Sequence, residues 1–233
     1  MNKKNKKEIT FLYFSTNIPE NLKNINECIN LEKLYCNHSH NYLELNNLPY
    51  NLKFLECHNN KIISLDNLPP YLKKLNCFRN TISQLDYLPI NLVELNCGCN
   101  IITSLDNLPN TLEILDCSNN KITNLERLPK NLKQLVCDKN LIISLDNLPN
   151  TLEILDCSNN KITSLDNLPS NLIILTCIFN KIANLNNLPD SVQNLVFKEN
   201  PLEYKFYPSL NNIKKYIQNK KIKEIKKIKK ICQ

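Results

Sequence analysis

The sequence predicts a solenoid in which short parallel strands stack into one curved β-sheet and return through extended or 3-10 segments. Two observations support this fold class. Cysteine recurs every 20 residues from Cys57 to Cys177, and 21 residues after Cys36, at the same point of the motif LxxLxCxxNxIxxLxxLP. The stretch SLDNLPNTLEILDCSNNKIT also occurs twice, at 104–123 and at 144–163. A repeat of this length cannot bury its own apolar face, so neighbouring repeats are expected to stack and share one core.

Each repeat is expected to supply one strand. Leu115 and Cys117 are two residues apart, so both side chains point to the same face of a strand. Asp116 and Ser118 point to the other face, which forms the concave surface. Nine such strands, about 4.8 Å apart, make a sheet about 40 Å long. The nine anchor positions are Cys36, Cys57, Cys77, Cys97, Cys117, Cys137, Cys157, Cys177 and Phe197.

The return segment of each repeat carries a leucine and a proline. Proline recurs every 20 residues from Pro49 to Pro189, three residues before the next apolar position. Proline disfavours a regular helix at this point, because it lacks an N–H and restricts the residue before it. The convex side is therefore expected to consist of extended chain or short 3-10 turns.

Asparagine recurs three residues after each anchor, except in the first repeat, where Ser39 takes its place. Such a buried amide must be paired, and it can tie one turn of the backbone to the turn of the next repeat. The recurring residues are Asn60, Asn80, Asn100, Asn120, Asn140, Asn160, Asn180 and Asn200.

These motifs resemble the leucine-rich repeat, whose consensus contains LxxLxLxxN. The resemblance covers residues 31–200 and implies a leucine-rich repeat solenoid, an α/β-type horseshoe with a structural asparagine ladder. The 20-residue length and the LPxxL segment resemble the short repeats of bacterial effectors. The use of Asn, Lys and Ile, with Cys on the strand, is similar to repeat proteins of large DNA viruses that infect amoebae.

Three segments follow from the repeat boundaries. Residues 1–30 form an N-terminal cap or truncated repeat, residues 31–200 hold about nine repeats, and residues 201–233 form a C-terminal cap with a basic helix. A stacked core needs caps at both ends. A covering strand is expected from Ile9, Phe11, Leu12 and Phe14. Ser209 is a candidate helix cap, and isoleucine at every third position after residue 221 predicts a helix with a broad apolar arc.

Composition excludes several classes of function. The single glycine, Gly98, excludes glycine-rich phosphate loops. The sequence contains no run of eighteen apolar residues, so no transmembrane helix is expected. The N-terminus lacks the pattern of a secretory signal. We therefore expect a cytoplasmic protein in an intracellular, reducing environment, with the cytoplasm of a host cell as one option. The net charge of +7 is uneven: residues 1–10 contribute +3 and residues 211–233 contribute +8, which leaves about 7 − 3 − 8 = −4 for the body.

The cysteine column is expected to be part of the core. Thiols on a straight column do not converge on one point, as a zinc site requires, and a buried thiol behaves as a small apolar group. Cys99 is the candidate for a reactive thiol because it follows a strand. Cys36, His38, His40 and His58 lie close in sequence, but their spacing matches no standard zinc finger. We expect no metal and no cofactor.

The candidate binding residues lie on the concave face, where solenoids usually bind. The N-terminal group mixes aromatic and charged side chains, and the C-terminal group is mostly apolar, as interfaces often are. The first group is Phe54, Glu56, His58, Lys74, Asn76, Phe78 and Arg79. The second group is Ile174, Thr176, Ile178 and Phe179.

The function predicted from these features is that of a non-catalytic scaffold that binds a protein partner of unknown identity. No catalytic residues and no small-molecule substrate are expected. Bacterial effectors with similar repeats can carry a ubiquitin-ligase domain, but only 33 residues follow Asn200. The alternative is an adaptor anchored to anionic membrane or nucleic acid by the lysines of residues 211–233.

Overall fold

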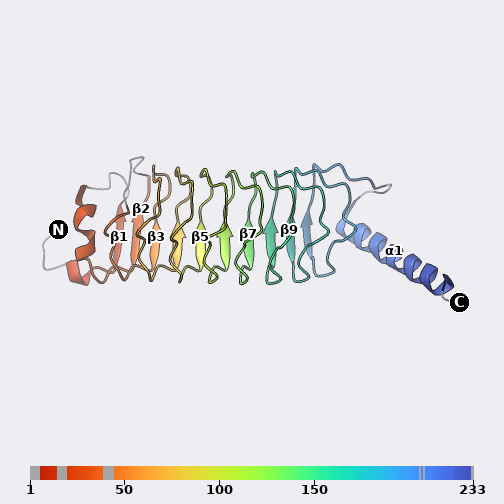
Figure 1. Ribbon diagram of the computed structural model, residues 1–233, viewed down its shortest axis with the longest axis horizontal. Coiled ribbons are helices and arrows are strands. Elements are labelled where there is room, and N and C mark those ends of the chain that lie inside the picture. Colours follow the sequence, from red (N-terminus) through yellow and green to blue (C-terminus); the bar gives the residue numbers. More distant parts are fainter. Residues whose placement is uncertain (1–5, 15–19, 39–44, 205, 207, 232–233) are drawn as a thin grey trace.

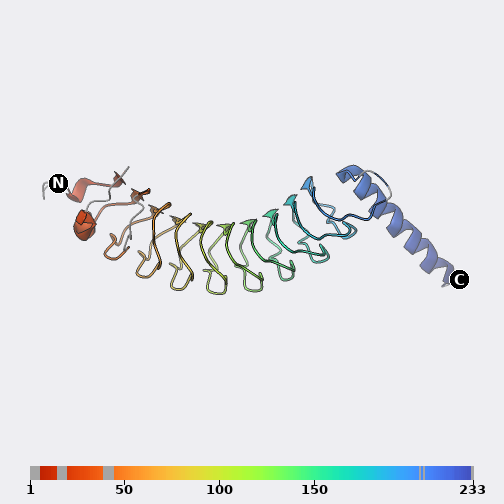
Figure 2. The same ribbon diagram turned by 90° about the horizontal axis from the view of Figure 1, so that it is seen from above.

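The computed structural model describes residues 6–14, 20–38, 45–204, 206 and 208–231. Within them, parallel strands stack in chain order into one sheet, and an α-helix follows (Figure 1). The strands line the concave side of an arc and the return segments form its convex side (Figure 2). The strands are β1 (Phe11–Phe14), β2 (Lys33–Cys36), β3 (Phe54–Glu56), β4 (Lys74–Asn76), β5 (Glu94–Asn96), β6 (Ile114–Asp116), β7 (Gln134–Val136), β8 (Ile154–Asp156), β9 (Ile174–Thr176) and β10 (Asn194–Val196).

The register of the sheet keeps every repeat in phase. Leu75 of β4 pairs with Leu55 on one side and with Leu95 on the other, so like residues stack on like residues. These central leucines and the anchor cysteines that follow them are buried, whereas the residues between them are wholly or partly exposed. The alternation predicted for the strands is confirmed. It arises because successive side chains of a strand point to opposite faces.

The return segments contain turns and extended chain, and no residue from 57 to 193 is helical. Each proline begins a tight turn that leads into the next strand. The Leu72 N–H, for example, donates to the Pro69 carbonyl at 3.1 Å. The turn uses the proline carbonyl as an acceptor and does not need the missing proline N–H.

A second set of side-chain bonds, which the sequence reasoning did not include, runs along the convex side. The Asp106 N–H donates to Ser104 Oγ at 3.1 Å, which closes a local turn. Asn107 Nδ2 then donates to Asp86 Oδ1 of the preceding repeat at 2.6 Å. The recurring letters SLDN are explained by these bonds, because serine shapes the turn and the Asp–Asn pair joins neighbouring repeats.

Asparagine occupies several left-handed backbone positions of the kind that glycine usually fills. Asn59, Asn119 and Asn159 take φ values of 55°, 52° and 54° just before a ladder asparagine. Arg79 and Phe179 adopt the same conformation at the equivalent positions, with φ of 55° and 53°. The repeat therefore imposes this backbone shape even on side chains that disfavour it.

β1 caps the N-terminal end of the core, as predicted. Leu12 and Phe14 pack partly buried against the core, but Phe11 is 52% exposed and points to the concave face. The expectation that Phe11 covers the core is therefore wrong, because it alternates with Leu12 along the strand. Two 3-10 segments, η1 (Lys6–Glu8) and η2 (Glu20–Glu27), flank β1 in the sequence, and a Lys6–Glu27 ion pair of 2.9 Å joins them.

The helix α1 (Leu210–Ile231) forms the C-terminal cap. Ser209 is its N-cap, since Ser209 Oγ accepts a hydrogen bond from the Asn212 N–H at 3.2 Å. Ile213 and Ile217 are buried on one side of the helix, next to the core of the last repeats. Among the described residues, no helix is both long and apolar enough to cross a membrane.

Candidate binding surface on the concave face

The candidate surface consists of the outward side chains of the strands and the two residues after each anchor, and we call it the concave surface. Four of its members form an aromatic row at the N-terminal end: Phe11, Tyr13, Tyr35 and Phe54. Tyr35 lies in the middle, with ring centroids 5.2 Å from Phe11, 6.1 Å from Tyr13 and 5.1 Å from Phe54. Phe11 and Tyr13 are 52% and 59% exposed, so the row presents a large aromatic area to solvent.

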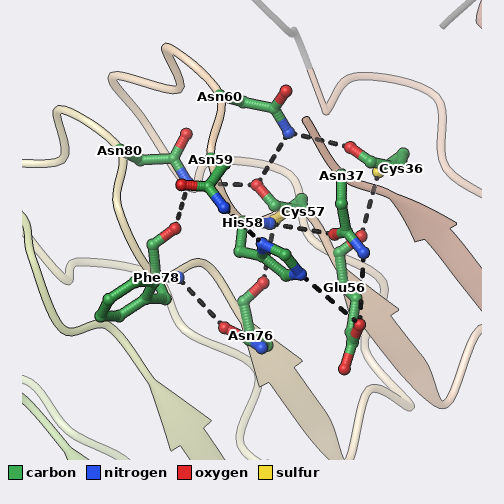
Figure 3. A network of polar contacts seen from close by, with 10 residues as sticks. All are labelled: Cys36, Asn37, Glu56, Cys57, His58, Asn59, Asn60, Asn76, Phe78 and Asn80. Carbon is green, nitrogen blue, oxygen red and sulfur yellow. Dashed lines mark hydrogen bonds and ion pairs between the residues drawn. The ribbon is translucent and has the colours of Figure 1, made fainter. Parts of the chain in front are cut away.

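Glu56 and His58 lie beside the aromatic row in a polar network (Figure 3). Asn37 Nδ2 donates to Glu56 Oε2 at 3.3 Å, and the His58 N–H donates to Asn37 Oδ1 at 3.2 Å. The His58 ring is 3.9 Å from Glu56 and packs edge-on against His38. Burial and the neighbouring His38 hold the pKa of His58 below its usual value, and Glu56 opposes them in part. The imidazole is therefore favoured in its neutral form.

The next strand contributes Lys74, Asn76 and Phe78. Lys74 Nζ is 2.6 Å from Glu94 Oε1, an exposed ion pair. Asn76 Oδ1 accepts a hydrogen bond from the Phe78 N–H at 3.2 Å, so this predicted binding residue also shapes the turn (Figure 3). A methyl group on Gly98 would lie 3.1 Å from the Phe78 ring. The single glycine thus leaves room for Phe78 to lie against the neighbouring repeat, while Arg79 extends into solvent from the turn.

The middle of the concave surface is acidic. Asp116, Asp138 and Asp156 lie on neighbouring strands and turns, and burial together with the nearby Asp156 raises the pKa of Asp138. Asp116 and Asp156 also accept hydrogen bonds from the backbone N–H groups of Ser118 and Ser158, both at 3.0 Å. Asp116 and Asp156 therefore stabilise the turns that follow their strands, in addition to facing the concave surface.

The C-terminal group lies on β9 and the turn after it. Ile174, Thr176 and Ile178 are half-buried, and Phe179 is 56% exposed. These side chains form the apolar patch predicted from the sequence. Five strand steps separate β4 from β9, which places the two groups about 24 Å apart. The structure thus brings the predicted residues together as two separate areas.

The asparagine ladder is present. Asn80 Nδ2 donates to the carbonyls of Cys57 and Cys77 at 3.1 and 2.9 Å, and the Ile62 N–H donates to Asn80 Oδ1 at 3.0 Å. Asn60 likewise bonds to the carbonyls of Cys36 and Cys57 (Figure 3). The partners belong to the asparagine's own repeat and to the repeat before it. The predicted role is confirmed: each ladder asparagine joins its own turn to that of the adjacent, preceding repeat. Ser39 of the first repeat lies outside the described residues.

The cysteine column is buried, and all ten described cysteines are free. Burial raises the pKa of the Cys77 thiol to about 12, so the thiol stays protonated at neutral pH. Cys77 Sγ lies 3.4 Å from the Asn96 carbonyl of the next strand, to which it donates a weak hydrogen bond. Cys99 is only half-buried, and Asn119 Nδ2 lies 3.1 Å from its sulfur. No cluster of three or more potential metal ligands occurs among the described residues, while His40 lies outside them.

The sequence reasoning missed Phe11, Tyr13 and Tyr35 as surface candidates. Tyr35 comes just before Cys36, so the alignment on cysteine placed it in the same row as Glu56. Phe11 and Tyr13 alternate with two core residues in the string FLYF, which is the pattern of a half-buried strand. The signals were present, but only the pairing of β1 with β2 shows that the three rings meet.

No family model matches the sequence, and no curated protein matches it. Solved structures do match. YopM from Yersinia enterocolitica WA-314 is 29% identical with a TM-score of 0.61, over 78% of this chain and 49% of YopM. The internalin InlF from Listeria monocytogenes is 22% identical with a TM-score of 0.71, over 83% of this chain and 62% of InlF. The functional domain of InlJ from the same species includes a cysteine ladder; it is 25% identical with a TM-score of 0.56, over 88% of this chain and 57% of InlJ.

The chain thus spans about half of YopM and less than two thirds of either internalin. The shared element is the stack of short repeats, and the cysteine column here has a named counterpart in InlJ. Parallel strands on the concave side, extended returns, an asparagine ladder and these neighbours agree. In fold, the chain is a leucine-rich repeat solenoid with a helical C-terminal cap.

Proposed function

We propose that this solenoid is a non-catalytic scaffold that binds a protein partner through its concave surface. The observation that carries the proposal is the aromatic row of Phe11, Tyr13, Tyr35 and Phe54. Contiguous exposed aromatic side chains are uncommon on monomeric proteins and are enriched at the centres of protein interfaces. The row lies on rigid paired strands, so little conformational entropy is lost when a partner covers it.

The spacing of the two areas supports a macromolecular partner. The aromatic row lies on β1, β2 and β3, and the apolar patch lies on β9 and the turn after it. These strands line the same concave side of the arc (Figure 2). A contact that reaches from Phe54 on β3 to β9 crosses six strand steps and must span about 29 Å. A small folded domain covers this distance, whereas a small molecule does not. An interface of about 800 Å² on each partner would include both areas.

A non-catalytic role without a small-molecule substrate is part of the proposal. In the described part of the chain, the side chains of Glu56 and His58 make their hydrogen bonds, ion pairs and ring contacts with Asn37, His38, Asn59 and each other. None of these groups is a nucleophile that the imidazole could activate. The arrangement favours binding over chemistry.

A reducing location is also proposed, within a cell or in the cytoplasm of a host cell. The support is the set of free thiols, since a disulfide-forming compartment would favour their pairing. An effector-like role is part of the proposal, and its support is the likeness to YopM, a leucine-rich effector protein of Yersinia pestis. The resemblance to repeat proteins of amoeba-infecting viruses rests on composition and stays a prediction.

Affinity capture with matched variants tests the proposal. A variant with Tyr35→Ala and Phe54→Ala removes half of the aromatic row, and we expect it to lose at least about tenfold in affinity for the captured partner. Its control is Tyr50→Ala with Tyr71→Ala, a pair of exposed rings with centroids 5.2 Å apart that lies outside the concave strands. Both variants are first shown to be folded by circular dichroism.

The expected result is that the control captures the same protein as the unmodified chain and the concave variant does not. Equal capture by both variants would remove the aromatic row from the interface. Loss of binding in the control alone would place the interface on the edge that carries Tyr50 and Tyr71. Either result would overturn the proposal.

A further inference from the structure

Residues 218–227 of α1 are not buried by the body of the protein. Every residue from Gln218 to Lys227 is exposed, whereas Ile213 and Ile217 in the first half are buried. The helix extends outward from the end of the solenoid in both views (Figures 1 and 2). Ten residues of helix correspond to about 15 Å of free rod. We call residues 218–227 the projecting helix.

The projecting helix carries two isoleucines on one side with lysines on both flanks: four lie in a wide arc, and Lys221 lies about 40° beyond Ile225 on the other flank. At about 100° per residue, Ile222 and Ile225 lie about 60° apart on one side. They are 44% and 53% exposed. A larger arc, about 120° wide, begins about 40° from Ile222. The lysines in that arc are Lys220, Lys223, Lys226 and Lys227.

Residues 210–227 of α1 carry a strongly positive net charge. Residues 210–227 contain seven lysines and one acidic residue, Glu224, which gives 7 − 1 = +6. The repeats between the two basic ends carry about −4. The helix is thus a local basic element at one end of a mildly acidic body, which fits an anionic partner.

We propose that the projecting helix binds an anionic membrane surface, with Ile222 and Ile225 inserted between the headgroups and the lysines beside the phosphates. This inference goes beyond the proposed protein binding and uses a different part of the molecule. Exposed isoleucines beside a lysine arc are the two features that an interfacial helix needs. The long lysine stems place their charges at headgroup level while the isoleucines go deeper.

Nucleic acid is the competing occupant, and the helix suits it less well. Base recognition uses arginine and stacked aromatic rings, and residues 210–231 contain no arginine. Their one aromatic residue, Tyr216, packs against Tyr204 and Phe206 with ring centroids 5.6 and 5.5 Å apart. A phosphate backbone would engage the lysines and leave Ile222 and Ile225 in water.

Vesicle co-sedimentation with the full chain tests the proposal. The probes are vesicles of phosphatidylcholine alone and vesicles that also contain phosphatidylserine. We expect binding to the anionic vesicles only, weakened by salt. Lys223→Glu, Lys226→Glu and Lys227→Glu together should weaken it by at least about 100-fold. Ile222→Ser with Ile225→Ser, which keeps every charge, should weaken it about tenfold.

Two matched controls separate the helix from the net charge and from general hydrophobicity. Lys121→Glu, Lys161→Glu and Lys181→Glu make the same charge change on exposed residues of the body. Ile63→Ser with Ile143→Ser replaces two isoleucines that are exposed on the return segments. Neither control should change vesicle binding by more than about threefold.

The result that overturns the proposal is defined in three ways. The first is that the anionic vesicles fail to sediment the chain. The second is that the control variants with substitutions in the repeats lose as much vesicle binding as the helix variants. The third is that a DNA duplex or an RNA strand binds more tightly than the vesicles and is unaffected by the isoleucine substitutions. The Tyr35→Ala, Phe54→Ala variant should bind vesicles normally, so failure of one proposal does not imply failure of the other.

Discussion

Replacing the ladder residue Asn120 by alanine is expected to lower the free energy of unfolding by about 4 kcal/mol. The residue is only 9% exposed. Its Oδ1 accepts a hydrogen bond from the Ile102 N–H at 2.9 Å. The two N–H groups of its Nδ2 are shared among the Cys97, Cys117 and Ser118 carbonyls, all at 3.1 Å. Alanine removes the bonds of both the amide oxygen and the amide nitrogen at a place where water has little access.

The magnitude follows from what each partner retains. The Cys97 carbonyl still accepts a hydrogen bond from Asn100 at 3.0 Å, and the Cys117 carbonyl still accepts one from Asn140 at 3.0 Å. Each carbonyl therefore loses one net bond of about 0.5–1.5 kcal/mol. The Ile102 N–H loses its acceptor and pays about 1–3 kcal/mol as an unsatisfied buried donor. The sum centres near about 4 kcal/mol.

Urea denaturation followed by circular dichroism measures the effect. The matched control is Asn131→Ala, because the exposed Asn131 Nδ2 makes one bond, to the Asn110 carbonyl at 3.1 Å. The control should change stability by less than about 0.5 kcal/mol. Equal stability of the Asn120 and Asn131 variants would refute the idea that the ladder satisfies buried backbone groups.

Three further outcomes are expected. Ser158→Ala should stabilise the protein by up to about 1 kcal/mol in the same assay, because Ser158 Oγ is buried without a partner in the described part of the chain; the half-exposed twin Ser118 should show no gain, and a loss at Ser158 would contradict this reading. Burial and nearby carboxylates raise the pKa of Asp138, so its ionised form destabilises the native state. At neutral pH, Asp138→Asn should therefore be more stable than the unmodified chain, and this difference should vanish as the pH falls and Asp138 becomes protonated. A stability difference that does not change with pH would argue against this cause. Brief alkylation of the native protein, read by peptide mass spectrometry, should label Cys99 and spare Cys117, and rapid labelling of Cys117 would disprove the buried column.

Much of the fold could be predicted because one repeat determines its neighbours. Leu115 and Cys117 set the buried face of a strand, and the 20-residue period then places every equivalent residue in register. The ladder asparagines and the Ser209 cap followed from the same local rules. These features depend on short-range periodicity and on the need to pair buried polar groups.

The candidate site could be predicted only in part, because it depends on contacts that the period does not encode. Tyr35, Phe11 and Tyr13 meet where the capping strand joins the first repeat, before the regular spacing begins. The turn bonds of Asn76 and Asp116 were missed because their alternation indicates only an outward direction. An outward side chain on a strand can either stabilise the following turn or contact a binding partner, and only three-dimensional contacts distinguish these two roles.

The identical segments 104–123 and 144–163 lie between the aromatic row and the apolar patch, on the strands β6 and β8. Recombination between the two identical segments would remove 40 residues and leave one copy of the segment. Every core residue would then pack against the same type of neighbour as before. Such recombination would also bring the two contact areas closer by two strand spacings, about 10 Å. The number of repeats thus sets the distance between the two contact areas, and recombination between the identical segments changes that distance without changing the packing of the core.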